Sequence, residues 1–310
     1  MSKKIIFMGT PLFAVPTLKS LYQNGYPISV VYTQPPQKSN RGYKINKSPI
    51  QNISETLNID FRSPKTLQDN KEEYQFLKEL NADLAIVVAY GQIIPKNFLT
   101  LTKKGFINIH GSILPNWRGA APIQRSIMNL DTETGISVMK IEEKLDSGPV
   151  SNVYKIKLNN NDNAQEVSEK LSNLAAEKIL DNIDDILEDK AKFVNQDHTK
   201  ASYAKKIDKN EGKINWNDEA KIIIGKINGL FPIPGAFFNF HGERYKILKA
   251  EIGNGIGQAG EVISDKLEVA CNNNKSIKII EIQRQGKKPQ KIGEFMLGSQ
   301  IKKGSIISNV

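Results

Sequence analysis

The stretch KKIIFMGTPLFAVPTLKSLYQNGYPISVVYTQ, residues 3–34, carries the pattern that decides the fold. A short apolar run ends at Gly9, and a run rich in β-branched residues occupies residues 27–34. Between them, apolar residues recur at helical spacing before Gly25, at Leu12, Val15, Leu18 and Leu21. This order of strand, helix and strand predicts a βαβ unit.

The same alternation continues along the chain. Residues 70–81 have helical spacing, while residues 82–91 (ADLAIVVAYG) and 105–112 (GFINIHGS) are strand-like. Apolar runs without alternating polar residues indicate strands that are covered on both faces. We therefore expect a Rossmann-like α/β domain with a doubly wound, mostly parallel sheet.

The pattern changes after this sheet. Residues 135–158 predict two strands joined by a turn at residues 146–149, and residues 162–190 predict a long amphipathic helix. Residues 191–212 are polar and lack periodicity, which is typical of a linker.

The last third of the chain has only short strand-like runs, which favours a small all-β barrel or sandwich. These runs are residues 260–264, 266–271 and 275–283. We place a catalytic domain at residues 1–189, a linker at 190–205 and a second domain at 206–310.

Net charge is concentrated in the same C-terminal part. Residues 200–310 contain 19 lysines and arginines against 11 aspartates and glutamates, whereas residues 1–199 contain 24 against 22. Such a basic module favours a polyanionic partner, because cations that neutralise phosphates release condensed counterions. A solvated surface kept soluble by like charge explains the same excess.

Composition limits the class of protein. The only cysteine is Cys271, so no intrachain disulfide or thiolate metal cluster can form, and a cytoplasmic location fits best. The N-terminal sequence MSKKIIFMGTP turns after four apolar residues, so we expect neither secretion nor a membrane span. The three histidines, His110, His198 and His241, lack ligand spacing, so we expect no metal.

Two classes of nucleotide-binding protein are disfavoured, the nicotinamide dehydrogenases and the P-loop ATPases or kinases. Gly9 follows the first expected strand, but GTPLFAVP lacks the further glycines that let a pyrophosphate approach the backbone. The glycines of residues 253–260 precede a strand-like run, so they indicate a hairpin loop. The Walker pattern of P-loop proteins is absent from the sequence.

Two polar residues interrupt the apolar run INIHGSILPNWRGAAP, residues 107–122. Strand alternation places Asn108 and His110 on one face, near the strand end where open α/β sheets bind ligands. Asp146, in the following turn, is the best carboxylate to orient the imidazole. This set, without a serine or cysteine nucleophile, favours direct acyl transfer. Alternatively, Asn108 and His110 cap loop backbone and Asp146 is an ordinary turn residue.

Three segments of the chain resemble signatures of the folate-dependent formyltransferase family. They are FMGTPLFAVPTL (7–18), NIHGSILPNWRGAAPIQRSI (108–127) and EKLDSGPV (143–150). Four further segments are similar to that family in the same order: TQPPQKSNRG (33–42), ADLAIVVAYGQIIP (82–95), YAKKIDKNEGKINW (203–216) and NGLFPIPGAFF (228–238). The resemblance therefore covers nearly the whole chain.

The resemblance implies an activity and its partners. A formyl group would pass from 10-formyltetrahydrofolate, the donor substrate, to the α-amino group of methionine on initiator methionyl-tRNA, for translation initiation. The second domain would be an OB-like barrel that binds tRNA, and we expect a monomer. Another folate-dependent formyltransferase, a formyl-folate hydrolase and a non-catalytic RNA-binding adaptor are the alternatives.

The resemblance also implies roles for individual residues. The catalytic trio would be Asn108, His110 and Asp146, and the folate-contacting loop would be Ser112, Ile113, Leu114 and Pro115, where the family usually has leucine at the second position. The residues assigned to tRNA are Arg41, Lys44, Lys205, Lys206 and Lys209. Phe13 would border the methionine side chain, or else pack in the core.

Two residues of the loop after His110 have open roles. We expect Trp117 to anchor the loop by packing. Arg118 could contact the folate tail or an RNA phosphate, or lie on the surface. In the resulting hypothesis, Asn108 holds the formyl oxygen, His110 handles protons and Asp146 orients His110.

Overall fold

A computed structural model describes residues 3–39 and 44–308, and the chain forms two compact units. The first unit consists of Met1–Ala120, Thr134–Ile156 and Ser168–Ala204, and the second of Ala121–Glu133, Lys157–Val167 and Lys205–Val310. Each unit has a separate hydrophobic core. The domain boundaries expected at residues 189 and 205 stay a prediction.

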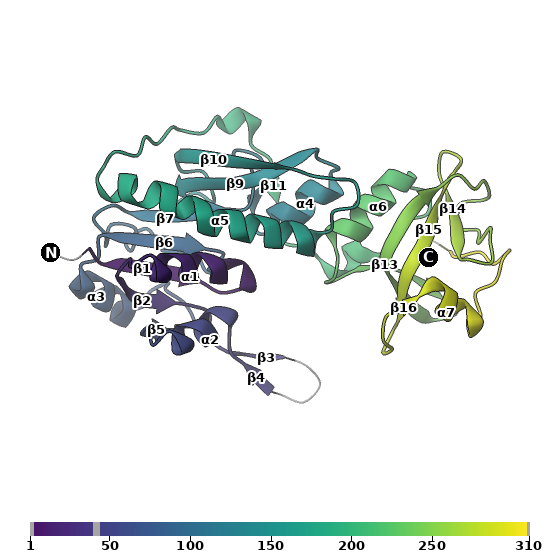
Figure 1. Cartoon of the computed structure of the whole chain (residues 1–310), viewed down its shortest axis with the longest axis horizontal. Coiled ribbons are helices and arrows are strands. Elements are labelled where there is room, and N and C mark those ends of the chain that lie inside the picture. The colour runs from purple at the N-terminus through teal and green to yellow at the C-terminus, as the bar shows by residue number, and fades with distance from the viewer. Residues whose placement is uncertain (1–2, 40–43, 309–310) are drawn as a thin grey trace. The chain divides into compact units, whose positions relative to one another are not determined.

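The first unit is built on a seven-stranded sheet, with strand order β10-β9-β7-β6-β1-β2-β5 (Figure 1). The strands are β1 (Ile5–Gly9), β2 (Ile28–Tyr32), β5 (Phe61–Arg62), β6 (Leu84–Val88), β7 (Phe106–His110), β9 (Glu133–Lys140) and β10 (Val150–Lys157). Pairing is parallel from β5 through β2, β1 and β6 to β7, and β9 joins β7 antiparallel. The predicted mostly parallel sheet is therefore confirmed.

Helices α1 (Val15–Gln23) and α5 (Ala164–Leu187) run side by side over this sheet (Figure 1). The Ser20 hydroxyl of α1 donates a hydrogen bond to the Ala176 carbonyl of α5 at 2.7 Å. Helix α1 starts later than its spacing predicts, because a 3-10 turn, Leu12–Ala14, precedes it. The Leu12 side chain is 74% exposed and does not belong to the buried stripe.

The remaining helices of this unit are α2 (Pro49–Thr56) and α3 (Lys71–Leu80). Short strands complete it: β3 (Gln37–Ser39) with β4 (Lys44–Asn46), and β8 (Arg118–Gly119) with β11 (Tyr203–Ala204). The sequence patterns did not predict α2 or these short strands. None of the helices in residues 3–39 and 44–308 has the length and apolar character that crossing a bilayer requires.

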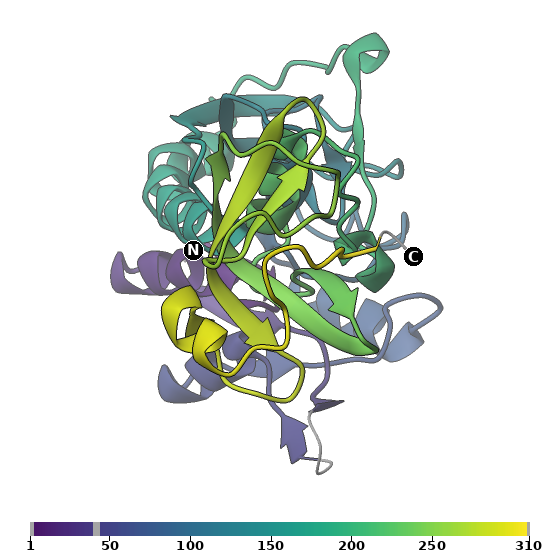
Figure 2. The ribbon, with the colours of Figure 1, turned by 90° about the vertical axis from the view of Figure 1, so that its right-hand side faces the viewer.

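The second unit contains a five-stranded antiparallel sheet that forms an OB-like half-barrel (Figure 2). Its strands are β12 (Ala236–Phe240), β13 (Glu243–Gly253), β14 (Glu268–Cys271), β15 (Lys275–Arg284) and β16 (Gln290–Lys291). The expected all-β module is confirmed in its sheet. The prediction of a strand at residues 260–264 is wrong, because that segment forms only isolated β-bridges.

Three helices accompany this sheet in the second unit: α4 (Pro122–Met128), α6 (Ala220–Gly229) and α7 (Ile292–Leu297). The sequence patterns predicted none of them. The consecutive isoleucines of α6 resemble a strand, although Ile223 and Ile227 are buried at helical spacing. The core contains Trp216, with its ring centroid 5.9 Å from that of Phe238, which in turn stacks on Tyr245.

Candidate active site

Strand β7 brings the two polar residues of its apolar run to a partly open face. The Asn108 side chain belongs to a half-buried residue, whereas His110 is 6% exposed. No described residue forms a hydrogen bond with the Asn108 amide. The amide is therefore available to a ligand, which distinguishes it from an asparagine that caps loop backbone.

His110 is held between the loop that follows it and Asp146. Its Nε2 lies 2.9 Å from the Trp117 carbonyl oxygen, and its Nδ1 lies 3.7 Å from Asp146 Oδ2. A carbonyl oxygen only accepts hydrogen bonds, so Nε2 carries a proton and Nδ1 faces the carboxylate. The structure thus brings together two residues of the expected trio that lie on separate segments.

The loop after β9 folds back to place Asp146. Its carboxylate oxygen Oδ2 accepts a hydrogen bond from the Gly119 backbone N–H at 2.8 Å. Asp146 has a φ of +46°, in the left-handed region that aspartate enters more readily than most residues. Close packing fixes the same loop, because a Cβ on Gly148 would clash with the Lys140 carbonyl oxygen.

The segment assigned to folate, Ser112–Pro115, is shaped by hydrogen bonds to its own backbone and to β9. The Ser112 hydroxyl donates to the Asn116 carbonyl at 2.6 Å. Ser137 of β9, which is fully buried, donates to the Ser112 carbonyl at 2.7 Å and accepts from the Leu114 N–H at 3.0 Å. This serine therefore holds the turn at Ser112 and at Leu114.

Sequence reasoning missed two residues of this region. Ser137 is a single hydroxyl in a strand, a pattern that is equally common on solvated faces. Gln196 lies in the polar segment expected to be a linker, yet its side-chain amide reaches the carbonyls of Asp146 and Gly148. Its distance of 50 residues from Asp146 leaves no local signal in the sequence.

The structure does not test the roles assigned to three other residues, Phe13, Lys44 and Arg41. Phe13 lies half-buried in the 3-10 turn, and its carbonyl accepts a hydrogen bond from the Ser172 hydroxyl. Lys44 belongs to strand β4, and Arg41 lies outside the described residues. The roles of all three stay predictions.

In the second unit, the assigned lysines Lys205, Lys206 and Lys209 are exposed. None of them forms an ion pair with another described residue. Arg125 of α4 fixes their segment, donating to the Lys205 carbonyl at 3.2 Å and forming a two-point ion pair with Glu211. This guanidinium holds the pKa of the Glu211 carboxyl below its usual value. The result is an ordered backbone that presents unpaired cations.

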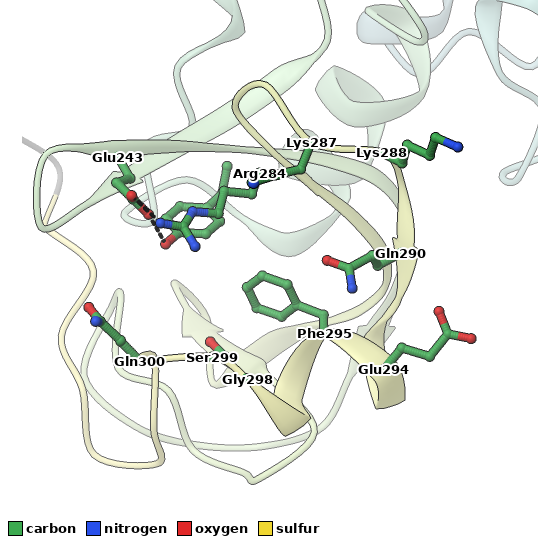
Figure 3. Close-up of a pocket in the computed structure, with 11 residues that line it drawn as sticks. Glu243, Arg284, Lys287, Lys288, Gln290, Glu294, Phe295, Gly298, Ser299 and Gln300 are labelled. Atoms are coloured by element: carbon green, nitrogen blue, oxygen red, sulfur yellow. Dashed lines mark hydrogen bonds and ion pairs between the residues drawn. The ribbon is translucent and has the colours of Figure 1, made fainter.

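The second unit also contains a pocket of about 420 Å³ beside α7 (Figure 3). Glu243 and Arg284 face each other across one side of it, and Lys287 and Lys288 line its upper edge in that view. Since Glu243 offsets the charge of Arg284, the two lysines make this edge basic. Across residues 3–39 and 44–308, no group of three or more His, Cys, Asp or Glu side chains is arranged to hold a metal ion.

Comparison with known proteins supports the resemblance of these motifs. Residues 3–183 match the family model described as formyl transferase, and residues 206–300 match the formyl transferase C-terminal domain. The chain belongs to the formyl transferase family. The predicted membership of this family is therefore confirmed.

Relatives within the formyl transferase family cover all or nearly all of the chain. The methionyl-tRNA formyltransferase of Pelagibacter ubique (strain HTCC1062) is 68% identical over 310 residues, with 100% of both chains covered. The methionyl-tRNA formyltransferase of Chelativorans sp. (strain BNC1) is 39% identical and covers 98% of this chain and 99% of its own. Both similarities span the two units.

Two solved structures share the fold. A sugar 3N-formyl transferase, solved in the presence of dTDP and 5-N-formyl-THF, has a TM-score of 0.69 at 19% identity and covers 93% of this chain and all of its own. HypX from Aquifex aeolicus, solved with tetrahydrofolic acid, has a TM-score of 0.66 at 15% identity and covers 96% of this chain and 47% of its own. At these identities, the likeness establishes the architecture alone.

The double hydrogen bond of Ser137 yields a test of the loop. Ser137→Ala leaves the Ser112 carbonyl and the Leu114 N–H without their partner, so we expect the free energy of unfolding to fall by about 1–3 kcal/mol. Denaturant titration measures this loss. Thr134→Val is the matched control in the same strand, because the buried Thr134 hydroxyl has no partner among the described residues. Equal losses in the two variants would contradict the assignment.

Proposed function

We propose that this formyl transferase moves the formyl group of 10-formyltetrahydrofolate onto the α-amino group of methionine carried by initiator tRNA. The observation that carries the proposal is the distance of 3.7 Å between His110 Nδ1 and Asp146 Oδ2. His110 lies on strand β7, which also bears Asn108, whose amide forms no hydrogen bond with a described residue. Full-length similarity to methionyl-tRNA formyltransferases supports the choice of acceptor.

The reaction needs a proton balance but no covalent enzyme intermediate. The amine nitrogen bonds to the formyl carbon, and the bond from that carbon to the folate nitrogen then breaks. The amine loses one proton and the folate nitrogen gains one. Ser112, two residues after His110 in the chain, is fully buried and donates to a carbonyl, so it is unsuited to act as a nucleophile.

His110 supplies the proton-handling group in this proposal. Because Nε2 is committed to the Trp117 carbonyl, Nδ1 is the nitrogen that exchanges a proton. Its separation of 3.7 Å from Asp146 exceeds a direct hydrogen bond and leaves room for a bridging water or a migrating proton. Asp146 then stabilises the imidazolium and fixes the ring orientation.

Asn108 and the Ser112–Pro115 turn would handle the donor. The amide of Asn108 can donate to the formyl oxygen as that oxygen gains negative charge, and it does not first have to break a bond to the protein. The turn, fixed by Ser137, would present its backbone to the folate. The tetrahydrofolate ligands of solved structures with this fold agree with such a donor.

The role of Asn108 can be measured directly. Asn108→Ala removes a donor to the oxyanion, so we expect kcat to fall by about 10²–10³ while the KM values change little. Steady-state formylation of charged tRNA supplies both constants. Asn52→Ala, on an exposed position of α2, is the control. Near-full turnover by Asn108→Ala would rule out this role.

The unpaired lysines of the second unit predict a salt effect. Replacing Lys205 and Lys206 by glutamine should raise the KM for tRNA and lower the slope of log KM against log salt by about 1–2, as two phosphate contacts are lost. The KM for formyl-folate should not change. Lys178→Gln is the control, because Glu177 and Asp181 already engage that lysine. An unchanged slope in the double variant would contradict tRNA binding there.

The function itself is tested by offering different acceptors. The purified protein is incubated with 10-formyltetrahydrofolate and either charged initiator tRNA, charged elongator methionyl-tRNA, a nucleotide-linked amino sugar or no acceptor. We expect formyl incorporation into the initiator species. Preferred transfer to the sugar, or release of formate without an acceptor, would replace the proposal with one of the other folate-dependent activities.

A further inference from the structure

Arg118 carries a buried charge that the mechanism above does not use. The residue is 3% exposed, and no carboxylate of the described residues lies within ion-pair distance of its guanidinium. Its partners are neutral: Nε and Nη2 donate to Gln196 Oε1 at 3.1 and 2.7 Å, and Nη2 donates to His198 Nδ1 at 2.9 Å. A buried charge is costly unless such bonds hold it.

Gln196 transmits this interaction to the loop that bears Asp146. Because a guanidinium only donates, the amide oxygen of Gln196 must face Arg118, and this fixes the direction of its NH₂ group. That group donates to the Asp146 carbonyl at 2.9 Å and to the Gly148 carbonyl at 2.7 Å. Both hydrogens of the amide are thus used to hold one turn.

The same turn is held from the other side by the backbone next to Arg118. The Gly119 N–H donates to the Asp146 carboxylate, and the Trp117 carbonyl accepts from His110. Residues 117–119 therefore fix the Asp146 carboxylate directly and the Asp146 backbone through Arg118 and Gln196. Asp146 needs this support because its φ of +46° is unfavourable for a residue with a Cβ.

We propose that Arg118 and Gln196 are positioning residues, which set the distance between the Asp146 carboxylate and His110 Nδ1 during formyl transfer. This inference rests on the proposed function. It assigns Arg118 to neither the folate tail nor an RNA phosphate, since Nε and Nη2 already donate to protein partners and the residue is buried. It also gives the polar segment around Gln196 a role in the chemistry.

The decisive variant is Gln196→Ala, because Gln196 is partly exposed and its truncation leaves no large cavity. We expect kcat to fall by about 10- to 100-fold, the cost of a small misplacement of a catalytic group, while the KM for each substrate stays within about threefold. Asn195→Ala, at the exposed neighbouring amide, is the matched control and should retain wild-type constants.

A double variant separates positioning from other effects. In an Asp146→Asn background, Gln196→Ala should lower kcat by less than about threefold, because residues that act as one unit are not additive. If the double variant instead lost kcat by the product of the two single-variant factors, the proposal would be overturned. Gln196→Glu still accepts from Arg118 but sets a carboxylate against two carbonyls, so it should be at least as impaired as Gln196→Ala.

The outcomes distinguish this inference from the function on which it rests. If the wild-type chain does not formylate charged tRNA, the proposed function fails. If it does, and Gln196→Ala raises the KM for folate or tRNA with kcat unchanged, then Arg118 and Gln196 serve binding and the positioning role is wrong. Thermal unfolding of each variant confirms that the protein assayed is folded.

Discussion

The backbone of residues 117–119 is the part of the structure on which the candidate site depends. One carbonyl of this tripeptide accepts from His110, and one N–H donates to the Asp146 carboxylate. Each peptide group is planar, so once the backbone dihedrals of Arg118 are fixed, the two peptide groups that flank it hold both partners in the same frame. The proposed proton-handling pair, His110 from a strand and Asp146 from a distant turn, thereby acquires a defined separation.

That backbone needs an unusual conformation, and the chain provides it locally. Trp117 has a φ of +61° and Gly119 a φ of +122°. At Gly119 a Cβ would lie 2.7 Å from the Ala204 carbonyl oxygen, so only glycine lets β8 pair with β11. The Trp117 N–H donates a hydrogen bond to the Ser202 hydroxyl oxygen. A segment far along the sequence therefore completes the support of the site.

Sequence patterns were sufficient for the parts of this protein that repeat a period. The βαβ unit, the apolar strands and the shared face of Asn108 and His110 all follow from periodicity. The roles of Ser137 and Gln196 do not, because a single polar residue carries no period and its partner lies elsewhere in the chain. Helix α6 was missed for a related reason: its run of isoleucines satisfies a strand pattern as well as a helical one.

Arg118 shows why such residues escape pattern reasoning. Arginine is almost never fully buried without a carboxylate partner, so its sequence position suggests surface or ligand contact. Here neutral acceptors hold it, and a buried charge held in this way is weak evidence for a role in stability. We expect such an arrangement where it fixes the position of a neighbouring group, because functional sites are where the usual rules of sequence and burial are broken. In this chain the departure from the rule occurs beside Asp146, where the proposed formyl transfer needs a fixed carboxylate.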